Sequence, residues 1–280
     1  MRDRALAAVA GGAAVAAALP WLLDDFLVSL GTSAFFGLGA YVSAWTVATA
    51  PWPVVVAGGA LVAAAFAGLA GLAILHLRGT YFAVLTFGLS ELTRHAVTYG
   101  EKQYAWTVGR VLTAVPSSLT VYVTVLVVAL AAVVVAVVVR GSRFGLALLG
   151  IGADEQRAET LGVPTRRVKV AGFALSAAFA GAVGAAMAVR WTYIDPTAVF
   201  NPFIGLQTVL IAIVGGPLSL TGPLLAALVF SLLAEFLRLQ FPYAYLIALG
   251  LLLIVAVLYL PHGLAGLWRR RGVEGPVAAQ

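Results

Sequence analysis

Two small groups of charged residues interrupt otherwise apolar segments of this 280-residue chain. Glu91, Arg94 and His95 are spaced i, i+3 and i+4, so all three can lie on one helix face and form ion pairs. Glu235 and Arg238 repeat the i, i+3 spacing. Because unpaired charge is costly in hydrocarbon, such groups usually face a bundle interior or an interface. They could line a transport path or bind a coupling ion, but a structural ion pair is the commoner use and is favoured here.

A third group of charges lies in the basic segment 140–169, where the pattern predicts a short amphipathic helix. Acidic residues alternate there with apolar ones, and the helix is bounded by Gly152 and by Gly162, with Pro164 shortly after. The residues that we single out on it are Asp154, Glu155, Ala158, Glu159, Leu161 and Gly162. A solvated loop helix would show the same pattern, so the residues alone leave open whether another protein binds here.

No motif for catalysis or metal binding is visible in the sequence. It contains no nucleotide-binding P-loop, no Ser-His-Asp set and no paired catalytic carboxylates. The chain has no cysteine, and its histidines, His76, His95 and His262, stand in unrelated places, which argues against a metal site. We therefore expect no enzymatic activity and no cofactor in this chain.

The composition is that of an integral membrane protein. Hydrophobic residues make up 62% of the chain and charged residues only 10%, with a mean hydropathy of +1.03, whereas soluble domains carry about 25% charge. The net charge of +6 is not a nucleic-acid signal. Basic residues gather in segment 140–169, at Arg2 and Arg4 and in the tail 269–271, as the positive-inside rule leads one to expect for cytoplasmic segments.

Hydropathy predicts an all-α, polytopic transmembrane helix bundle of about eight or nine segments. The predicted segments are 5–23, 26–49, 53–75, 79–100, 116–139, 170–190, 203–214, 218–240 and 243–260. Segment 203–214 is too short to cross unaided, and Gly215-Gly216-Pro217 is expected to end it. A second break is expected at Thr221-Gly222-Pro223. Short or interrupted spans are typical of transport proteins.

If segment 140–169 is cytoplasmic and each predicted segment crosses the membrane in turn, the basic tail 269–271 lies inside, as its charge requires. They also place Glu91 and Glu235 toward the outer half of the membrane, which argues mildly against ion coupling. The same count leaves Arg2 and Arg4 outside, on the unexpected side. We therefore expect either that segment 5–23 runs in the opposite sense or that 26–49 re-enters without crossing. A cleaved signal peptide at the start is the alternative.

Small residues mark faces for close helix packing. Gly31, Gly37 and Gly39 form one such face together with Ala34 and Ala40, and Gly68 and Gly71 form another. Small residues let helices approach closely, so packing is the expected role and flexible gating the less common one.

Five motifs then carry a family resemblance. In chain order they are SLGTSAFFGLGAY (29–41), LRGTYFAVLTFGLSELTR (77–94), SRFGLALLGIGADEQRAETLGV (142–163), GGPLSLTGPLLAA (215–227) and LPHGLAGL (260–267). Together they resemble the permease subunits of ABC importers for branched-chain amino acids, specifically the LivM type. Each motif is only moderately specific, but five in the right order form a strong match.

The resemblance implies a single transmembrane permease domain at 1–268, similar to type II ABC importer permeases, followed by a cytoplasmic tail at 269–280. It implies that segment 140–169 is a cytoplasmic coupling loop whose short helix docks on an ATPase. The implied partners are a LivH-type permease, two ATPase subunits that hold ATP-Mg, an extracytoplasmic substrate-binding protein and membrane lipid, with no nucleic acid. The implied location is the bacterial cytoplasmic (inner) membrane.

Other functions stay open beside this one. Relatives with similar permeases carry urea, short amides or other small polar solutes. An ion-coupled secondary transporter using Glu91 or Glu235, or a membrane scaffold without transport, would also fit an apolar polytopic chain. The chain differs from the family in having little sequence before the first motif, where relatives have a further helix, and in lacking a Gly- and Asp-rich segment at 100–115. We expect a shortened N-terminal region.

Overall fold

The computed structural model describes residues 29–77, 79–104, 106, 108–112, 116–191, 193–216, 221–241 and 250. Nearly all regular structure in them is helical, which confirms the predicted fold class. The helices are α2 (Thr32–Thr46), α3 (Trp52–Ile74), α4 (Thr80–Tyr104), α5 (Ser118–Arg140), α6 (Arg143–Ala153), α7 (Glu155–Thr160), α8 (Thr165–Ala188), α9 (Pro196–Val199), α10 (Pro202–Gly215) and α11 (Thr221–Gln240).

Within the described residues, four helical stretches are long and apolar enough to cross a membrane. They are Trp52–Ile74, Ser118–Arg140, Thr165–Ala188 and Pro196–Gly215. The valine-rich run 133–139 is helical in α5, because backbone groups in lipid must be satisfied within their own segment. The predicted segments 5–23 and 243–260 and the tail 269–280 lie outside the described residues.

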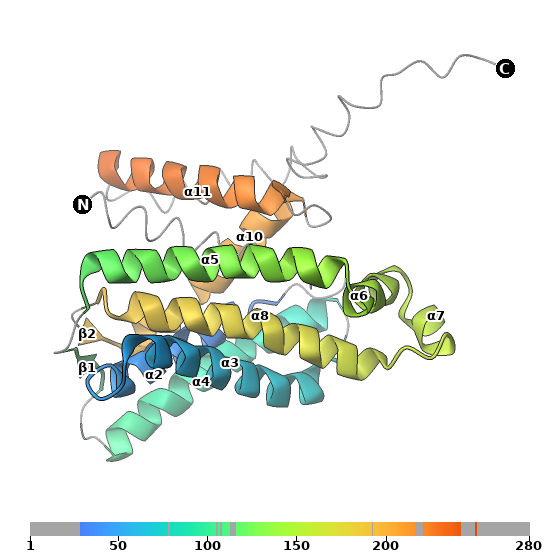
Figure 1. The fold of residues 1–280 in the computed structure, drawn as a ribbon. Coiled ribbons are helices and arrows are strands. Elements are labelled where there is room, and N and C mark those ends of the chain that lie inside the picture. The colour runs from blue at the N-terminus through green and yellow to red at the C-terminus, as the bar shows by residue number, and fades with distance from the viewer. Residues whose placement is uncertain are drawn as a thin grey trace, which may run out of the picture.

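The two ends of the bundle differ. Figure 1 shows α6 and α7 at one end and a short β-ribbon at the other. The ribbon pairs β1 (Arg110–Val111) with β2 (Tyr193–Ile194) in antiparallel register. The basic segment 140–169, which the sequence predicts to be cytoplasmic, belongs to the α6–α7 end.

Helices α2, α3 and α8 form the tightest part of the core and lie side by side in Figure 1. A Cβ atom added at Gly39 in α2 would lie only 2.0 Å from the carbonyl oxygen of Gly181 in α8. One added at Gly181 would lie 2.5 Å from the carbonyl oxygen of Gly59 in α3. At Gly37 it would lie 2.3 Å from the ring of Phe200. Glycine is therefore required where these helices touch.

Helix α2 is shorter than the predicted segment 26–49. Its 15 residues extend about 22 Å at 1.5 Å per residue, less than the hydrocarbon core of about 30 Å. The turn before it is held by α4, where Thr86 Oγ1 accepts from the Leu30 amide at 3.1 Å and Ser90 Oγ donates to the Leu30 carbonyl at 3.4 Å. These hydroxyls satisfy the backbone groups of Leu30, which have no helical partner there.

The predicted break after 203–214 is where α10 ends, at Gly215, and Gly216 follows with a φ of +90°. The second predicted break lies at the start of helix α11, whose first residues are Thr221, Gly222 and Pro223. Proline is tolerated in a first turn, where its missing amide hydrogen has no intrahelical partner to lose. A Cβ at Gly215 would lie 2.4 Å from Pro223, so α10 and α11 abut. Pro217 lies outside the described residues.

Candidate coupling site and intramembrane charges

The predicted helix of segment 140–169 is the second of two helices, α6 and α7. Asp154 separates them with an extended backbone (φ −162°, ψ 106°), and its carboxylate accepts a 3.1 Å hydrogen bond from the Arg157 amide. This is an N-cap, which satisfies an amide at the start of α7. Gly152 lies inside α6, so its predicted role as a boundary was wrong: the Asp154 cap sets the boundary instead.

The end of α7 lies where the sequence predicts it. Gly162 has a φ of +84°, its amide donates to the Glu159 carbonyl at 2.9 Å, and the Val163 amide donates to the Ala158 carbonyl at 3.1 Å. These two bonds form a Schellman motif, which favours glycine at the left-handed position. Buried Ala158 packs in a cluster with Ile151 of α6 and Val168 of α8, so α7 folds back against both neighbours.

Two of the acids singled out in the sequence bind the start of α8. Glu155 forms an ion pair with Lys169, and both side chains are largely buried. Glu159 accepts a 2.8 Å hydrogen bond from the Thr165 hydroxyl. Because α8 begins at Thr165, residues 165–169 of the predicted loop are its first turn. The carboxylates of α7 therefore attach α7 to a membrane helix.

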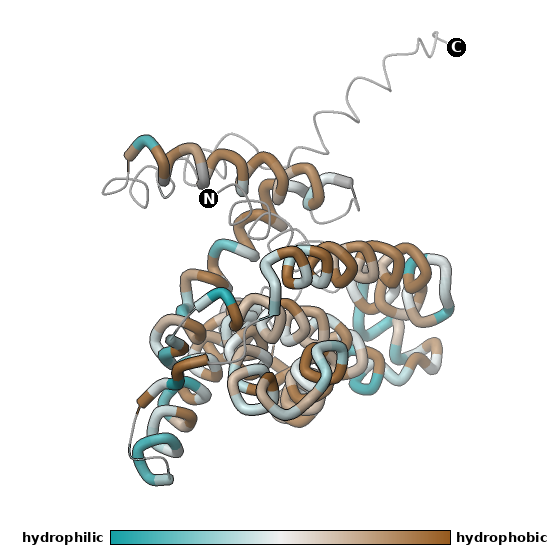
Figure 2. Tube along the Cα trace, turned by 60° about the vertical axis from the view of Figure 1, so that its left-hand side comes forward, coloured by the Kyte–Doolittle hydropathy of each residue, from teal (hydrophilic) through white to brown (hydrophobic). Residues whose placement is uncertain are grey.

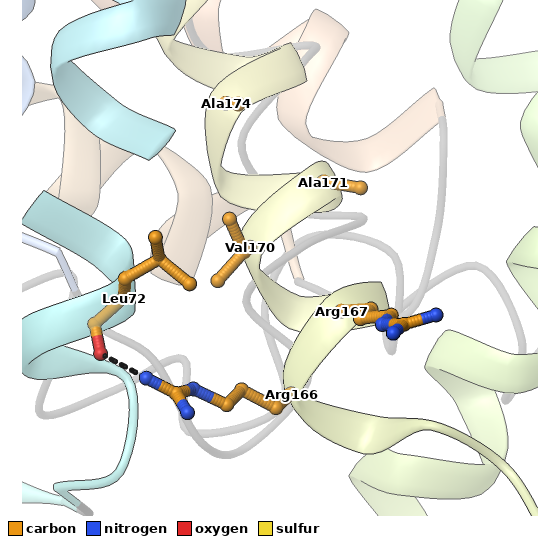
Figure 3. A pocket seen from close by; sticks show the side chains of 6 residues that line it. All are labelled: Leu72, Arg166, Arg167, Val170, Ala171 and Ala174. Atoms are coloured by element: carbon orange, nitrogen blue, oxygen red, sulfur yellow. Dashed lines mark hydrogen bonds between the residues drawn. The ribbon is translucent and has the colours of Figure 1, made fainter. Parts of the chain in front are cut away.

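The same first turn of α8 also holds the end of α3. Arg166 Nη2 donates to the Leu72 carbonyl at 3.1 Å, a bond drawn in Figure 3. Carbonyls in the last turn of a helix have no partner within the helix, so this arginine supplies one. A shallow pocket of about 400 Å³ lies between these segments, and Arg167 extends away from Leu72 in Figure 3. The start of α8 thus joins α7 to α3.

A groove of about 650 Å³ lies between α6 and α7. Leu146 and Leu161 line it, and Leu161 is 83% exposed. Arg143 and Arg157 stand at its rim, where Arg157 forms a 3.0 Å ion pair with Asp154. Exposed leucines and arginines therefore lie side by side along this groove.

The charges of α4 form the cluster that the spacing predicts. Arg94 donates to Glu91 Oε2 at 2.5 Å and 3.0 Å, and His95 Nε2 lies 3.8 Å from the same oxygen. Helix α4 runs on to Tyr104, beyond the predicted end at residue 100, so these residues lie near its middle rather than toward its outer part. This weakens the positional argument against ion coupling, whereas the ion pair itself fits a structural role.

Glu101 is a buried acid that the sequence reasoning missed. It is 5% exposed, and its Oε2 accepts hydrogen bonds from the Tyr41 hydroxyl at 3.1 Å and the Gly109 amide at 2.8 Å. Arg110 Nε lies 3.9 Å from its other oxygen, and the Arg110 guanidinium lies 3.7 Å from the centre of the Trp45 ring. These contacts join α4 to the β-ribbon end. Glu101 continues the helical spacing of the buried residues of α4. The predicted segment stopped at residue 100, so this signal was not used.

Comparison with known proteins identifies the family. The model of the branched-chain amino acid transport system permease component matches residues 13–258. The chain belongs to this family. It is 27% identical over 284 residues to the high-affinity branched-chain amino acid transport system permease protein LivM of Escherichia coli, covering 87% of this chain and 64% of that protein. The same-named protein of Salmonella typhimurium is 27% identical over 277 residues with the same coverage.

This permease-family chain therefore spans somewhat less than two thirds of the curated relatives that it matches. No solved structure matches it significantly. Family membership and the apolar helices confirm the resemblance drawn from the five motifs and show a multi-pass membrane protein of a transport family. Glu235 and Arg238 belong to α11, but their side chains lie outside the described part of the permease.

Proposed function

We propose that the chain is the LivM-type permease subunit of an ABC importer for branched-chain or other small neutral amino acids. It forms half of the pore, and its α6–α7 groove receives an ATPase subunit. The observation that carries this proposal is the attachment of α7, through Glu155 and Glu159, to the first turn of a membrane helix of a permease-family protein. A docking element without such an attachment could not transmit movement to the pore.

The contacts suggest how movement passes from the ATPase to the membrane. A displacement of α7 moves the first turn of α8, because Lys169 and Thr165 are bonded to the acids of α7. Arg166 carries the displacement to the end of α3. Farther along α8, Gly181 touches the backbone of α2 and α3, so the three helices must move together or slide past one another. Closely packed helices shift between discrete arrangements, which suits alternating access.

The other components supply what this chain lacks. ATP-Mg binds in two cytoplasmic ATPase subunits, a LivH-type permease completes the pore, and an extracytoplasmic binding protein delivers and selects the solute. In this proposal the complex lies in the bacterial cytoplasmic membrane. An ion-coupled mechanism through Glu91 is the rival, but Glu91 is already paired with Arg94 at 2.5 Å, so a coupling ion would have to displace this partner.

Leu161→Ala tests the docking surface in the complex of permease and ATPase subunits. Full burial of a leucine side chain contributes about 1.5–3 kcal/mol, so the variant should weaken ATPase binding by about 10- to 100-fold. Leu130→Ala, which truncates an exposed leucine of α5 in the membrane, is the matched control and should bind normally. Equal ATPase affinity of the two variants would refute docking at this groove.

Reconstituted vesicles test the activity itself. Leucine uptake should require ATP in the vesicle lumen, the binding protein outside and both permease subunits. Uptake of urea or short amides in place of leucine would support the importer function and refute the proposed amino-acid substrate. Uptake by this chain alone, without ATPase subunits, would refute the proposal.

A further inference from the structure

Helix α8 runs the length of the bundle, from α7 at one end to the β-ribbon at the other (Figure 1). Its first residues, Thr165, Arg166 and Lys169, bind α7 and the last turn of α3. Its other end leads within a few residues into β2, which pairs with β1. The contacts that hold the ribbon therefore hold the second end of α8.

The ribbon is bound to α4 through the buried carboxylate of Glu101, in the last turn of that helix. Figure 2 turns this end of the bundle forward and shows hydrophilic positions in α4, whereas α5 is hydrophobic over most of its length. Glu101 Oε2 accepts a 2.8 Å hydrogen bond from the Gly109 amide, and Arg110 Nε of β1 lies 3.9 Å from Oε1. A Cβ at Gly109 would lie 2.4 Å from the Tyr193 hydroxyl oxygen of β2, so the two strands meet here without room for a side chain.

Helix α2 is bound to the same carboxylate. The Tyr41 hydroxyl donates to Glu101 Oε2 at 3.1 Å. One turn farther along α2, the ring of Trp45 lies 3.7 Å from the Arg110 guanidinium. The chain after β2 and α9 returns to this point, where the fully buried ring of Phe200 stacks on Tyr41 with 5.8 Å between ring centres. The contacts form a closed ring through α2, α4 and both strands, with Glu101 at its centre.

Separating this ring of contacts is unfavourable. A buried carboxylate that loses its donors has neither protein nor water partners, which is strongly destabilising. The opposite end of α8 is joined to α7, a helix of only six residues, by the ion pair of Lys169 with Glu155 and the hydrogen bond of Thr165 with Glu159. A force on α7 therefore displaces the start of α8 more readily than its end.

We propose that Glu101 anchors the β-ribbon end of α8 to α2 and α4, so that α8 pivots about this end when α7 displaces its start. The inference rests on the proposed function for that displacement. Glu101 is a positioning residue here, because it acts through the ribbon. A ribbon that opens as a gate is the opposite arrangement, since the contacts of Glu101 would then break in every transport cycle.

A pivot at this end agrees with the tight helix packing. Gly181, which touches the backbone of α2 and α3, lies about 10 Å from the last residue of α8 and about 24 Å from Thr165 at 1.5 Å per residue. A tilt about the ribbon end moves each point of α8 in proportion to its distance from that end. The glycine contacts near the anchor therefore shift much less than the start of the helix.

A disulfide across the ribbon tests the pivot against the gate. Val111 and Tyr193 are directly opposite each other, and the chain has no cysteine of its own. Opposite residues of antiparallel strands have Cα atoms about 4.5–5.5 Å apart, which is within the range of a disulfide. In the complete transporter with Val111→Cys and Tyr193→Cys, ATP-driven leucine uptake should be the same or higher after oxidation than in dithiothreitol. A loss on oxidation that dithiothreitol reverses would overturn the pivot. So would a pair that is inactive in both states, because a locked ribbon should suffice as an anchor.

Glu101→Ala tests the anchor itself. The variant should bind the ATPase and hydrolyse ATP but lose uptake per ATP hydrolysed, because α8 then moves at both ends. Trp52→Phe is the matched control: it removes the 2.7 Å bond from Trp52 Nε1 to Thr124 of α5, and Trp52 packs on the same buried cluster as Ile194 of β2. It should keep uptake per ATP. Equal ratios of uptake to hydrolysis in the two variants would refute a role of Glu101 beyond stability. If Glu101→Ala does not fold, the disulfide pair, which keeps Glu101, decides.

Hydrogen exchange separates failure of the anchor from failure of the proposed function. In the purified chain, amides of 108–111 should exchange faster in Glu101→Ala than in Trp52→Phe, because the Gly109 amide loses its acceptor. Equal exchange rates would show that Glu101 does not hold the ribbon. If the unaltered chain supports no ATP-driven uptake with its partner subunits, the proposed function fails, and the anchor is then judged by exchange alone.

Discussion

Replacing Gly39 by alanine should destabilise the bundle, although alanine is the better helix former. Gly39 lies inside α2, where a glycine-to-alanine change by itself favours the helix by about 0.5–1 kcal/mol. The added methyl carbon, however, would lie 2.0 Å from the Gly181 carbonyl oxygen, whereas non-bonded heavy atoms prefer about 3.5–4.0 Å. That oxygen belongs to the backbone of α8 and cannot rotate away as a side chain would.

The cost follows from the forced separation of α2 and α8. Overpacking a close-packed core costs about 1–3 kcal/mol, which exceeds the gain in helix propensity. The net loss should therefore be about 1–2 kcal/mol, or a fall in Tm of roughly 2–8 °C for a protein of this size. Gly59 and Gly181 lie where the same helices touch. A second alanine at either position should therefore destabilise the protein by less than it would alone.

Thermal unfolding of the purified protein in detergent measures this difference, and Gly68 supplies the matched control. Gly68 is also in the interior of a helix, α3, but a Cβ added there meets nothing within 4 Å. Gly68→Ala should therefore leave the Tm unchanged or raise it slightly. If Gly39→Ala and Gly68→Ala gave the same Tm, the close approach of α2 and α8 would not exist as described.

Two further predictions concern coupling and energy source. Glu159→Lys should reduce copurification of the ATPase and uncouple hydrolysis from uptake, without loss of membrane insertion. Thr165→Val removes the same hydrogen bond to Glu159 without reversing a charge. A comparable defect in the Thr165→Val variant would assign the effect to the α7–α8 attachment. Normal uptake in both variants would contradict this coupling route. Transport should continue when a protonophore is added at constant ATP, and Glu91→Gln should lower assembly yield more than it alters any pH dependence of uptake. Collapse of uptake with the protonophore would favour an ion-coupled transporter.

The long apolar helices could be predicted from the sequence, because hydropathy alone determines which segments can lie in lipid. The segments 53–75 and 116–139 differ from α3 and α5 by only one or two residues at each end. The end of α7 at Gly162 could be predicted for a local reason, since a left-handed position favours glycine. The ion pair between Glu91 and Arg94 follows from helix spacing in the same way.

Only the tertiary structure decided what these local features face. The acids of α7 have the same sequence pattern whether they point to solvent or to α8, and the choice depends on Lys169 and Thr165, which the fold brings beside them. Glu101 is buried because the β-ribbon returns to it, a contact between residues that hydropathy treats as a loop. Helix α2 begins late because hydroxyls of α4 satisfy the backbone before it. The sequence determined which segments are helices in a membrane, because that depends only on each segment and the solvent around it. The partners of each polar group depend on contacts between distant segments, which only the folded chain supplies.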